Sequence, residues 1–159
     1  MGTSVLPTAH ASHRGERGRY ARVLLGLEIA LCVGAAGGAD YLISEPHTAM
    51  PAEYLSRTPF SSWTIPGVLL AVCVAVPAGV VAFGAATRRT FVHVGHPLVG
   101  LTLIGWIVVQ VAVLGPISVL QPAMFACGLA IGLLGVDNYR GARAAATSMQ
   151  ETDSRRSGR

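Results

Sequence analysis

A single carboxylate inside an apolar stretch is the residue of this sequence best placed to do chemistry. Glu28 lies within the apolar segment 23–43. An acid in a membrane helix is costly and usually faces the interior of a bundle or a water-filled space. At helical spacing it shares a face with small residues that would admit a neighbouring helix or water, namely Cys32, Ala35 and Ala39. Glu28 is therefore either a proton-linked acid or a structural residue, protonated or directed toward an arginine.

A second set of polar residues lies on the segments near 94–136. Thr102, Trp106 and Gln110 recur at every fourth position, which places them along one helical stripe, and Gln121 begins the next segment at a similar depth. Together with Glu28, these four residues are candidates to line a cavity that opens outward. The alternative, which the residue types favour, is hydrogen bonding between helices that holds the bundle together.

Metal, cofactor and catalytic sites have no support in the sequence. His93 and His96 stand close to Arg88 and Arg89, but the short segment offers no further ligand for a metal, so we expect both histidines at the membrane interface. The sequence contains no P-loop, GxSxG, HExxH or dinucleotide-binding pattern. We expect no metal, no cofactor and no enzymatic activity.

The most distinctive polar segment is rich in proline and aromatic residues. It runs from Pro51 to Gly67 and carries Tyr54, Phe60 and Trp63. Aromatic side chains of this kind settle at the level of the lipid headgroups. We expect these three residues to form an outer lid over the helices, either as an anchor in the interface or as a ligand gate.

The composition predicts the elements that must position these residues. The chain has 159 residues, of which 52% are hydrophobic and 13% charged, with a mean hydropathy of +0.52. This is far more apolar than an average soluble domain. Helices rise about 1.5 Å per residue, so segments of about 20 residues cross a bilayer core of about 30 Å. We expect an all-α bundle of four transmembrane helices.

The expected division of the chain follows the apolar segments. It consists of a disordered cytoplasmic tail at 1–20, a transmembrane domain at 21–138 and a polar cytoplasmic tail at 139–159. The transmembrane spans are expected at 22–43, 66–87, 94–114 and 117–136, with an outer loop at 44–65. Residues 90–136 carry no charged side chain and would reach about 70 Å as one helix, so Gly115-Pro116 must reverse the chain. Pro77 should kink or loosen the second span.

The arginines predict the orientation. All twelve basic residues are arginine, a usage typical of GC-rich bacterial genomes, and eleven of them border the apolar segments in three clusters. By the positive-inside rule these clusters place both ends of the chain in the cytoplasm, and they favour membrane orientation over nucleic-acid binding. A rival interpretation makes the first segment a cleaved signal peptide, but Glu28 would interrupt its apolar region.

Small residues recur at every fourth position in three spans and predict close helix packing, within one chain or between copies. These stripes are Ala30, Gly34 and Gly38; Ala71, Ala75 and Gly79; and Gly128 and Gly132, followed by Gly135.

Part of the chain resembles a known group of proteins. The string Thr58-Pro-Phe-Ser-Ser-Trp-Thr-Ile-Pro-Gly67, then Trp106 and Gln110, and Leu120-Gln-Pro122 resemble small uncharacterised four-helix integral membrane proteins of bacteria, notably actinobacteria, with an SPF-x-x-W/Y-x-IPG-like outer loop. The likeness covers about residues 22–136. It implies the same four-span architecture and transfers no activity.

Two functional hypotheses follow. The leading one is a non-catalytic accessory or interaction protein of the bacterial inner membrane, in contact with the lipid bilayer, acting as a homo-oligomer or beside a larger membrane complex, with no nucleic-acid partner. The alternative is a small-molecule or lipid binder, or a transporter-like bundle, with an outward-facing polar cavity. The first predicts tight packing in which Gln110 and Gln121 bond to each other or to backbone, whereas the second requires a wet cavity.

Overall fold

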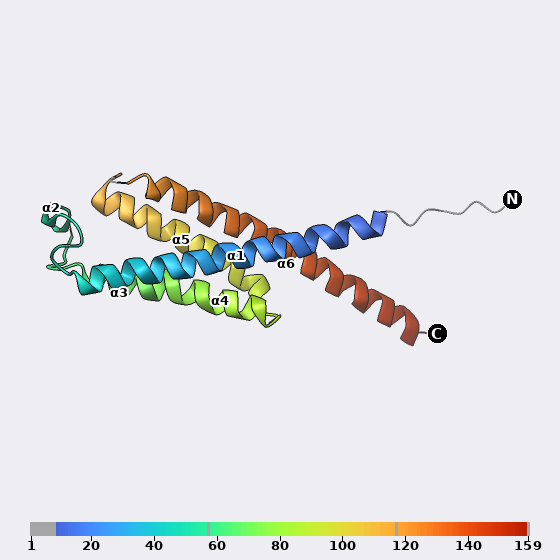
Figure 1. Ribbon diagram of the computed structural model, residues 1–159. Helices are drawn as coiled ribbons and strands as arrows, with labels where there is room; N and C mark the ends of the chain where they lie inside the picture. The colour runs from blue at the N-terminus through green and yellow to red at the C-terminus, as the bar shows by residue number, and fades with distance from the viewer. Residues whose placement is uncertain (1–8, 57, 117, 159) are drawn as a thin grey trace.

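The computed structural model is an elongated bundle of long helices (Figure 1). It describes residues 9–56, 58–116 and 118–158, and no strand occurs within these ranges. The elements are α1 (Ala9–Ser44), α2 (Ala52–Leu55), α3 (Thr64–Leu70), the π-helical turn η1 (Ala71–Ala75), α4 (Val76–Ala86), α5 (Val92–Leu114) and α6 (Leu120–Ser157). Because α3, η1 and α4 follow each other without a gap, they form one continuous span.

Four stretches are long and apolar enough to cross a membrane. They are Tyr20–Ser44, Thr64–Ala86, Val92–Leu114 and Leu120–Ser148. Large apolar side chains lie exposed on their outer surface, among them Val33, Phe83 and Leu133, as expected where lipid rather than water is the solvent. The predicted all-α bundle of four transmembrane helices is confirmed, and the chain is a multi-pass membrane protein.

The first and last helices, α1 and α6, extend beyond their membrane spans. The described part of the predicted N-terminal tail, residues 9–20, is helical and continuous with α1, and residues 1–8 lie outside the described ranges. At the other end α6 continues through the predicted polar tail to Ser157. Extending an existing helix adds one hydrogen bond per residue without a new nucleus, and the alanines after Gly141 favour it.

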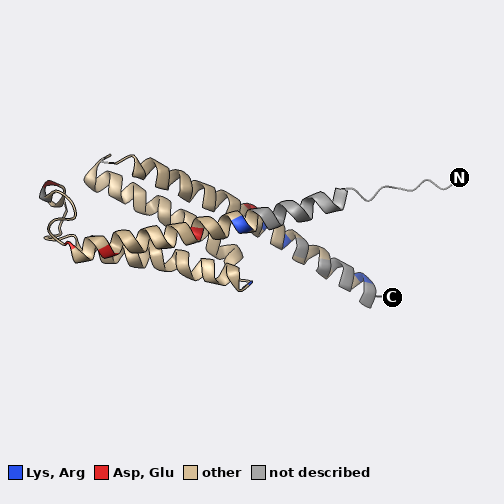
Figure 2. Cartoon of the chain, viewed as in Figure 1, with Lys and Arg blue, Asp and Glu red and all other residues tan. Residues whose placement is uncertain are grey.

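The bundle has two chemically different ends. The described arginines lie on α1, in the α4–α5 connection and on the later part of α6, and we call this the arginine end (Figure 2). The opposite loop end holds α2, the loop around it and the α5–α6 turn (Figure 1). Among the described residues of the four spans, Asp and Glu occur on α1 and α6. The α3–α4 span and α5 carry no Asp, Glu, Lys or Arg along their length.

Glycines bring α5 and α6 into close contact. A Cβ atom placed on Gly100 would lie 2.5 Å from the backbone nitrogen of Gly132 and 2.7 Å from the carbonyl oxygen of Gly128. A Cβ atom on Gly135 would lie 2.7 Å from the nitrogen of Pro97. The small-residue stripe predicted on residues 128–135 therefore packs within one chain, against α5.

The second span contains a local loosening, as its proline predicts. Residues Ala71–Ala75 form a π-helical turn, in which the backbone N–H of Val76 donates to the carbonyl of Ala71. Pro77 follows immediately and has no N–H to donate to Cys73. A wider turn at this point accommodates the missing bond, so the prediction of a loosened helix at Pro77 is confirmed.

The span ends in a left-handed residue. Arg88 has a φ of 55°, and the N–H of Arg89 donates to the carbonyl of Gly84 at 2.8 Å. Glycine is the usual residue in this conformation, because a side chain there strains the backbone. The tight reversal allows α5 to begin at Val92.

Candidate functional site

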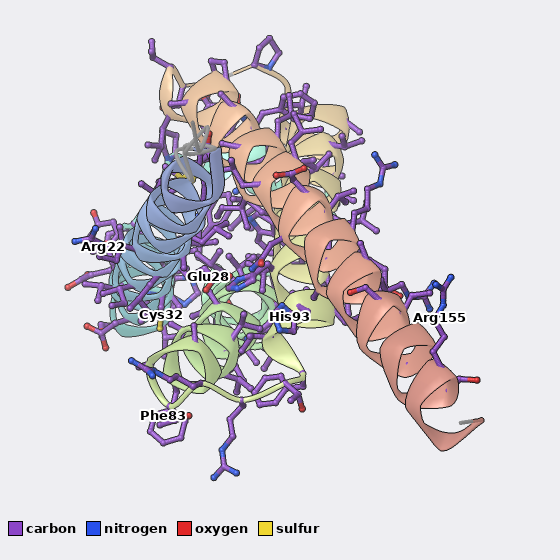
Figure 3. All side chains as sticks on the ribbon, turned by 90° about the vertical axis from the view of Figure 1, so that its right-hand side faces the viewer. Arg22, Glu28, Cys32, Phe83, His93 and Arg155 are labelled. Carbon is purple, nitrogen blue, oxygen red and sulfur yellow. The ribbon has the colours of Figure 1, made fainter. Side chains whose placement is uncertain are left out.

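A carboxylate and an imidazole meet in the interior of the bundle. Glu28 of α1 has no exposed surface and His96 of α5 is 3% exposed. The Nδ1 atom of His96 lies 2.6 Å from Oε1 of Glu28, within hydrogen-bond distance. Viewed from the arginine end, Glu28 points inward between the helices, whereas Phe83 points away from them (Figure 3). We call Glu28 and His96 the buried pair.

Glycines flanking His96 fix the position of α5 around the buried pair. A Cβ atom on Gly95 would lie 2.7 Å from a methyl carbon of Val81 on α4. On the other side, a Cβ atom on Gly135 of α6 would lie 2.8 Å from Cβ of His96. Because no side chain fits at either glycine, α4 and α6 pack closely against this turn of α5.

Apolar residues enclose the buried pair. Leu24 and Ile131 are fully buried, and the core cluster continues through Val74, Ala78 and Val81. Apolar side chains provide no charge to compensate that of an ionised Glu28. An ion pair or hydrogen bond is also stronger in this low-dielectric core than at a surface. The buried face predicted for Glu28 is confirmed on its own helix, since Ala35 and Ala39 are also buried.

Two polar atoms near the buried pair have no hydrogen-bond partner among the described residues. They are Oε2 of Glu28 and Nδ1 of His93, both cut off from solvent. An unsatisfied buried polar atom costs about 1–3 kcal/mol. His93 precedes His96 by three residues, so the two imidazoles are neighbours on the surface of α5. The site is therefore a buried carboxylate–imidazole pair, with a second, half-buried imidazole about one turn away on α5.

The histidines correct one expectation from the sequence. Both were expected at the membrane interface, and this is wrong for His96, which lies in the core as the partner of Glu28 in place of an arginine. The sequence does contain a pattern that relates Glu28 to His96, namely their distance from the arginines. Glu28 follows Arg22 by six residues and His96 follows Arg89 by seven. Since α1 and α5 run in the same direction, these similar spacings from the arginines put both side chains at nearly the same depth.

The predicted cavity residues lie in separate places. Thr102 is exposed and lines an open groove of about 360 Å³ between α4 and α5. Trp106 and Gln110 are half-buried, and Trp106 packs against the core cluster. Gln121 is buried and donates from Nε2 to the carbonyl of Gly115 at 3.2 Å. It also lines a second open groove, of about 940 Å³, at the α5–α6 turn. Glu28 lines neither of these grooves.

The predicted lid closes the loop end of the bundle. Trp63 is 2% exposed, and its Nε1 atom donates to the carbonyl of Met50 at 3.3 Å. It packs in a second apolar cluster with Leu42 and Leu114, against which Tyr54 also lies. Phe60 is half-buried at the edge of this loop. The loop is thus anchored by a buried tryptophan, which favours a structural cap over a gate.

Comparison with family models, curated proteins and solved structures finds no match for this chain. Its own geometry is therefore the basis for any assignment. That geometry defines a multi-pass membrane protein of four apolar helices, with an acid–histidine pair buried in its core.

Proposed function

We propose that the chain is a small accessory protein of the bacterial inner membrane, without catalytic activity, that associates with a second copy of itself through α1. Both ends lie in the cytoplasm. The observation that carries this proposal is a row of small residues on α1 that no other described helix covers.

The row runs along one side of α1 and consists of Gly26, Ala30, Gly34 and Gly37, all exposed. A Cβ atom added to any of its three glycines would meet no atom within 4 Å. Gly95 and Gly100 of α5 and Gly128 and Gly135 of α6, by contrast, are covered inside the chain. Small residues on a transmembrane helix let another backbone approach closely, and such faces are where membrane helices associate. We call this row the α1 face.

A second copy of the chain fits the α1 face because the same face on two copies is self-complementary. It carries no charged side chain, and two equal smooth surfaces meet across a two-fold axis without repulsion. The neighbouring Val33, 68% exposed, provides an apolar flank for such a contact.

The arginine distribution supports the orientation. In the sequence, eleven of the twelve basic residues fall in the three clusters that border the apolar segments, and the twelfth, Arg57, lies between the first two segments. Under the positive-inside rule the arginine end faces the cytoplasm. Introduced cysteines test this in a chain whose natural cysteines are replaced. One at Ser61 should react with an impermeant thiol reagent from the periplasmic side and one at Ser154 should not, and the reverse labelling would contradict the orientation.

The packing supports a structural role over the binding alternative. Gln121 bonds to backbone, as the accessory hypothesis requires, and the candidate cavity residues do not share one groove. The sequence lacks catalytic motifs, and apolar side chains surround the buried pair.

The association test compares two substitutions that add the same side chain to exposed glycines. Gly34→Leu fills the α1 face, and Gly105→Leu adds leucine to α5, where a Cβ atom also meets nothing within 4 Å. Energy transfer between labelled chains in liposomes should show Gly34→Leu weakening association at least about tenfold, which corresponds to about 1.4 kcal/mol. Gly105→Leu should associate like the unmodified chain.

Both variants should keep the helical content and thermal unfolding of the unmodified chain, because both positions are exposed and a Cβ atom there meets no atom within 4 Å. Equal association of the two variants, or no association of the unmodified chain, would contradict the proposal.

A further inference from the structure

An unpartnered oxygen of the buried pair points to a site that binds a proton. Oε2 of Glu28 is completely buried and accepts no hydrogen bond from a described residue. An ionised carboxylate only accepts hydrogen bonds, but a protonated carboxyl donates one. A buried oxygen without a donor therefore marks a place where a proton or a water molecule belongs.

Counting protons gives the two states of the buried pair. The contact of 2.6 Å between Nδ1 and Oε1 holds one proton between the two groups. With that proton alone the pair carries one net negative charge. A second proton, on Oε2 of Glu28 or on Nε2 of His96, makes the pair neutral overall. Because an apolar core disfavours an uncompensated charge, taking up this second proton changes the energetics of the whole cluster.

We propose that the buried pair is a proton-binding site that exchanges its proton with the arginine end through His93. His93 lies one turn closer to that end than His96, and its Nδ1 atom is buried and unpartnered among the described residues. Pro97 has no N–H to donate to the carbonyl of His93, which leaves a further acceptor beside the route. These unpartnered polar atoms suit a water molecule, which needs two to four polar partners.

The other helices bring few titratable groups to this core. Cys32 of α1, Cys73 of η1 and Cys127 of α6 pack against the core cluster, each half-buried. On α6, Asp137 is exposed two residues beyond Gly135. At the arginine end, Arg88 and Arg89 are exposed. The carboxylate and the two imidazoles are thus the groups that can pass a proton inward from this surface.

The proton site does not depend on association through the α1 face, since Glu28 and the exposed glycines lie on different sides of α1. A monomeric chain would bind the proton equally well, so failure of one proposal leaves the other intact.

Infrared spectroscopy tests the site directly. The chain, labelled with ¹³C in the glutamate carboxyl groups, is placed in vesicles with all arginine ends facing one side. Acidifying that side should produce a ¹³C carboxyl band of a buried, protonated glutamate, and acidifying the other side should not. The band should be absent in Glu28→Gln and unchanged in Glu45→Gln, a matched control in the exposed loop. His93→Leu should slow its appearance at least about tenfold.

Three results would overturn the inference. The first is a ¹³C carboxyl band that does not change across the pH range in which the chain stays folded. The second is an equal change of the band when either side is acidified. The third is a band that appears as fast in His93→Leu as in the unmodified chain. If Glu28→Gln does not fold, Glu28→Asp replaces it. This variant keeps a carboxyl group at position 28, but the group is unlabelled because only glutamates carry ¹³C, so the labelled band must vanish. Persistence of the band there assigns it to another glutamate and also refutes the site.

Discussion

A double-mutant cycle on the buried pair gives the sharpest test of its energetics. His96→Leu leaves both oxygens of Glu28 without a partner, and breaking a buried charged pair in this way costs about 3 kcal/mol or more. Glu28→Met leaves Nδ1 of His96 unsatisfied, at about 1–3 kcal/mol. The double variant removes both polar groups and should lie within about 1 kcal/mol of the unmodified chain, because apolar replacements of buried pairs are often neutral.

The coupling energy expected from this cycle is about 3–6 kcal/mol, the sum of the two single costs less that of the double variant. Ordinary hydrogen bonds between transmembrane helices couple by about 0.6 kcal/mol on average. The difference follows from the complete burial of Glu28 and the 2.6 Å contact. Reversible unfolding of the four chains in bicelles, followed by circular dichroism, measures it.

The control cycle combines Thr102→Val with Gln121→Leu, whose side chains lie in separate grooves and should be additive within about 0.5 kcal/mol. Additivity of the buried pair at the same level would refute the reasoning, because the two groups would then not depend on each other.

Three further substitutions, one of them with a matched control, test the packing and the backbone. Gly100→Ala should destabilise the chain by about 1–3 kcal/mol, since its Cβ atom would lie 2.5 Å from the backbone of α6, whereas Gly105→Ala should change the free energy of unfolding by less than about 0.5 kcal/mol. Trp63→Phe should cost about 1 kcal/mol at the loop end through loss of its bond to Met50, seen as faster amide exchange in that loop, and unchanged exchange would contradict the cap. Arg88→Gly should stabilise the fold by about 0.5–1 kcal/mol by removing left-handed strain, and a loss of stability would contradict that explanation.

The sequence predicted the helices well because membrane spans depend on local composition. Residues 66–86 hold no charge and residues 90–136 must reverse at Gly115, so the number of spans follows from helix length alone. The buried side of Glu28 was also predictable, since helical period places it with Ala35 and Ala39. These properties belong to one helix at a time.

Contacts between helices were harder to predict, because they depend on how the spans rotate against each other. Thr102, Trp106 and Gln110 were expected on one stripe, but four residues overshoot a turn by about 40°, so the stripe drifts by about 80° over its length. Thr102 is accordingly exposed while Gln110 is half-buried. His96 was expected at the interface because it follows Arg88 and Arg89 closely, and its neighbours Gly95 and Pro97 do not show that other helices pack against them.

A native mass spectrum of the protein, released gently from its own membrane, tests the proposed accessory role most directly. The account predicts a complex of two copies, with no bound small molecule, and loss of that complex in Gly34→Leu but not in Gly105→Leu. A single copy carrying a discrete small molecule or lipid, released when Gln121 is replaced, would contradict the account and establish the binding alternative.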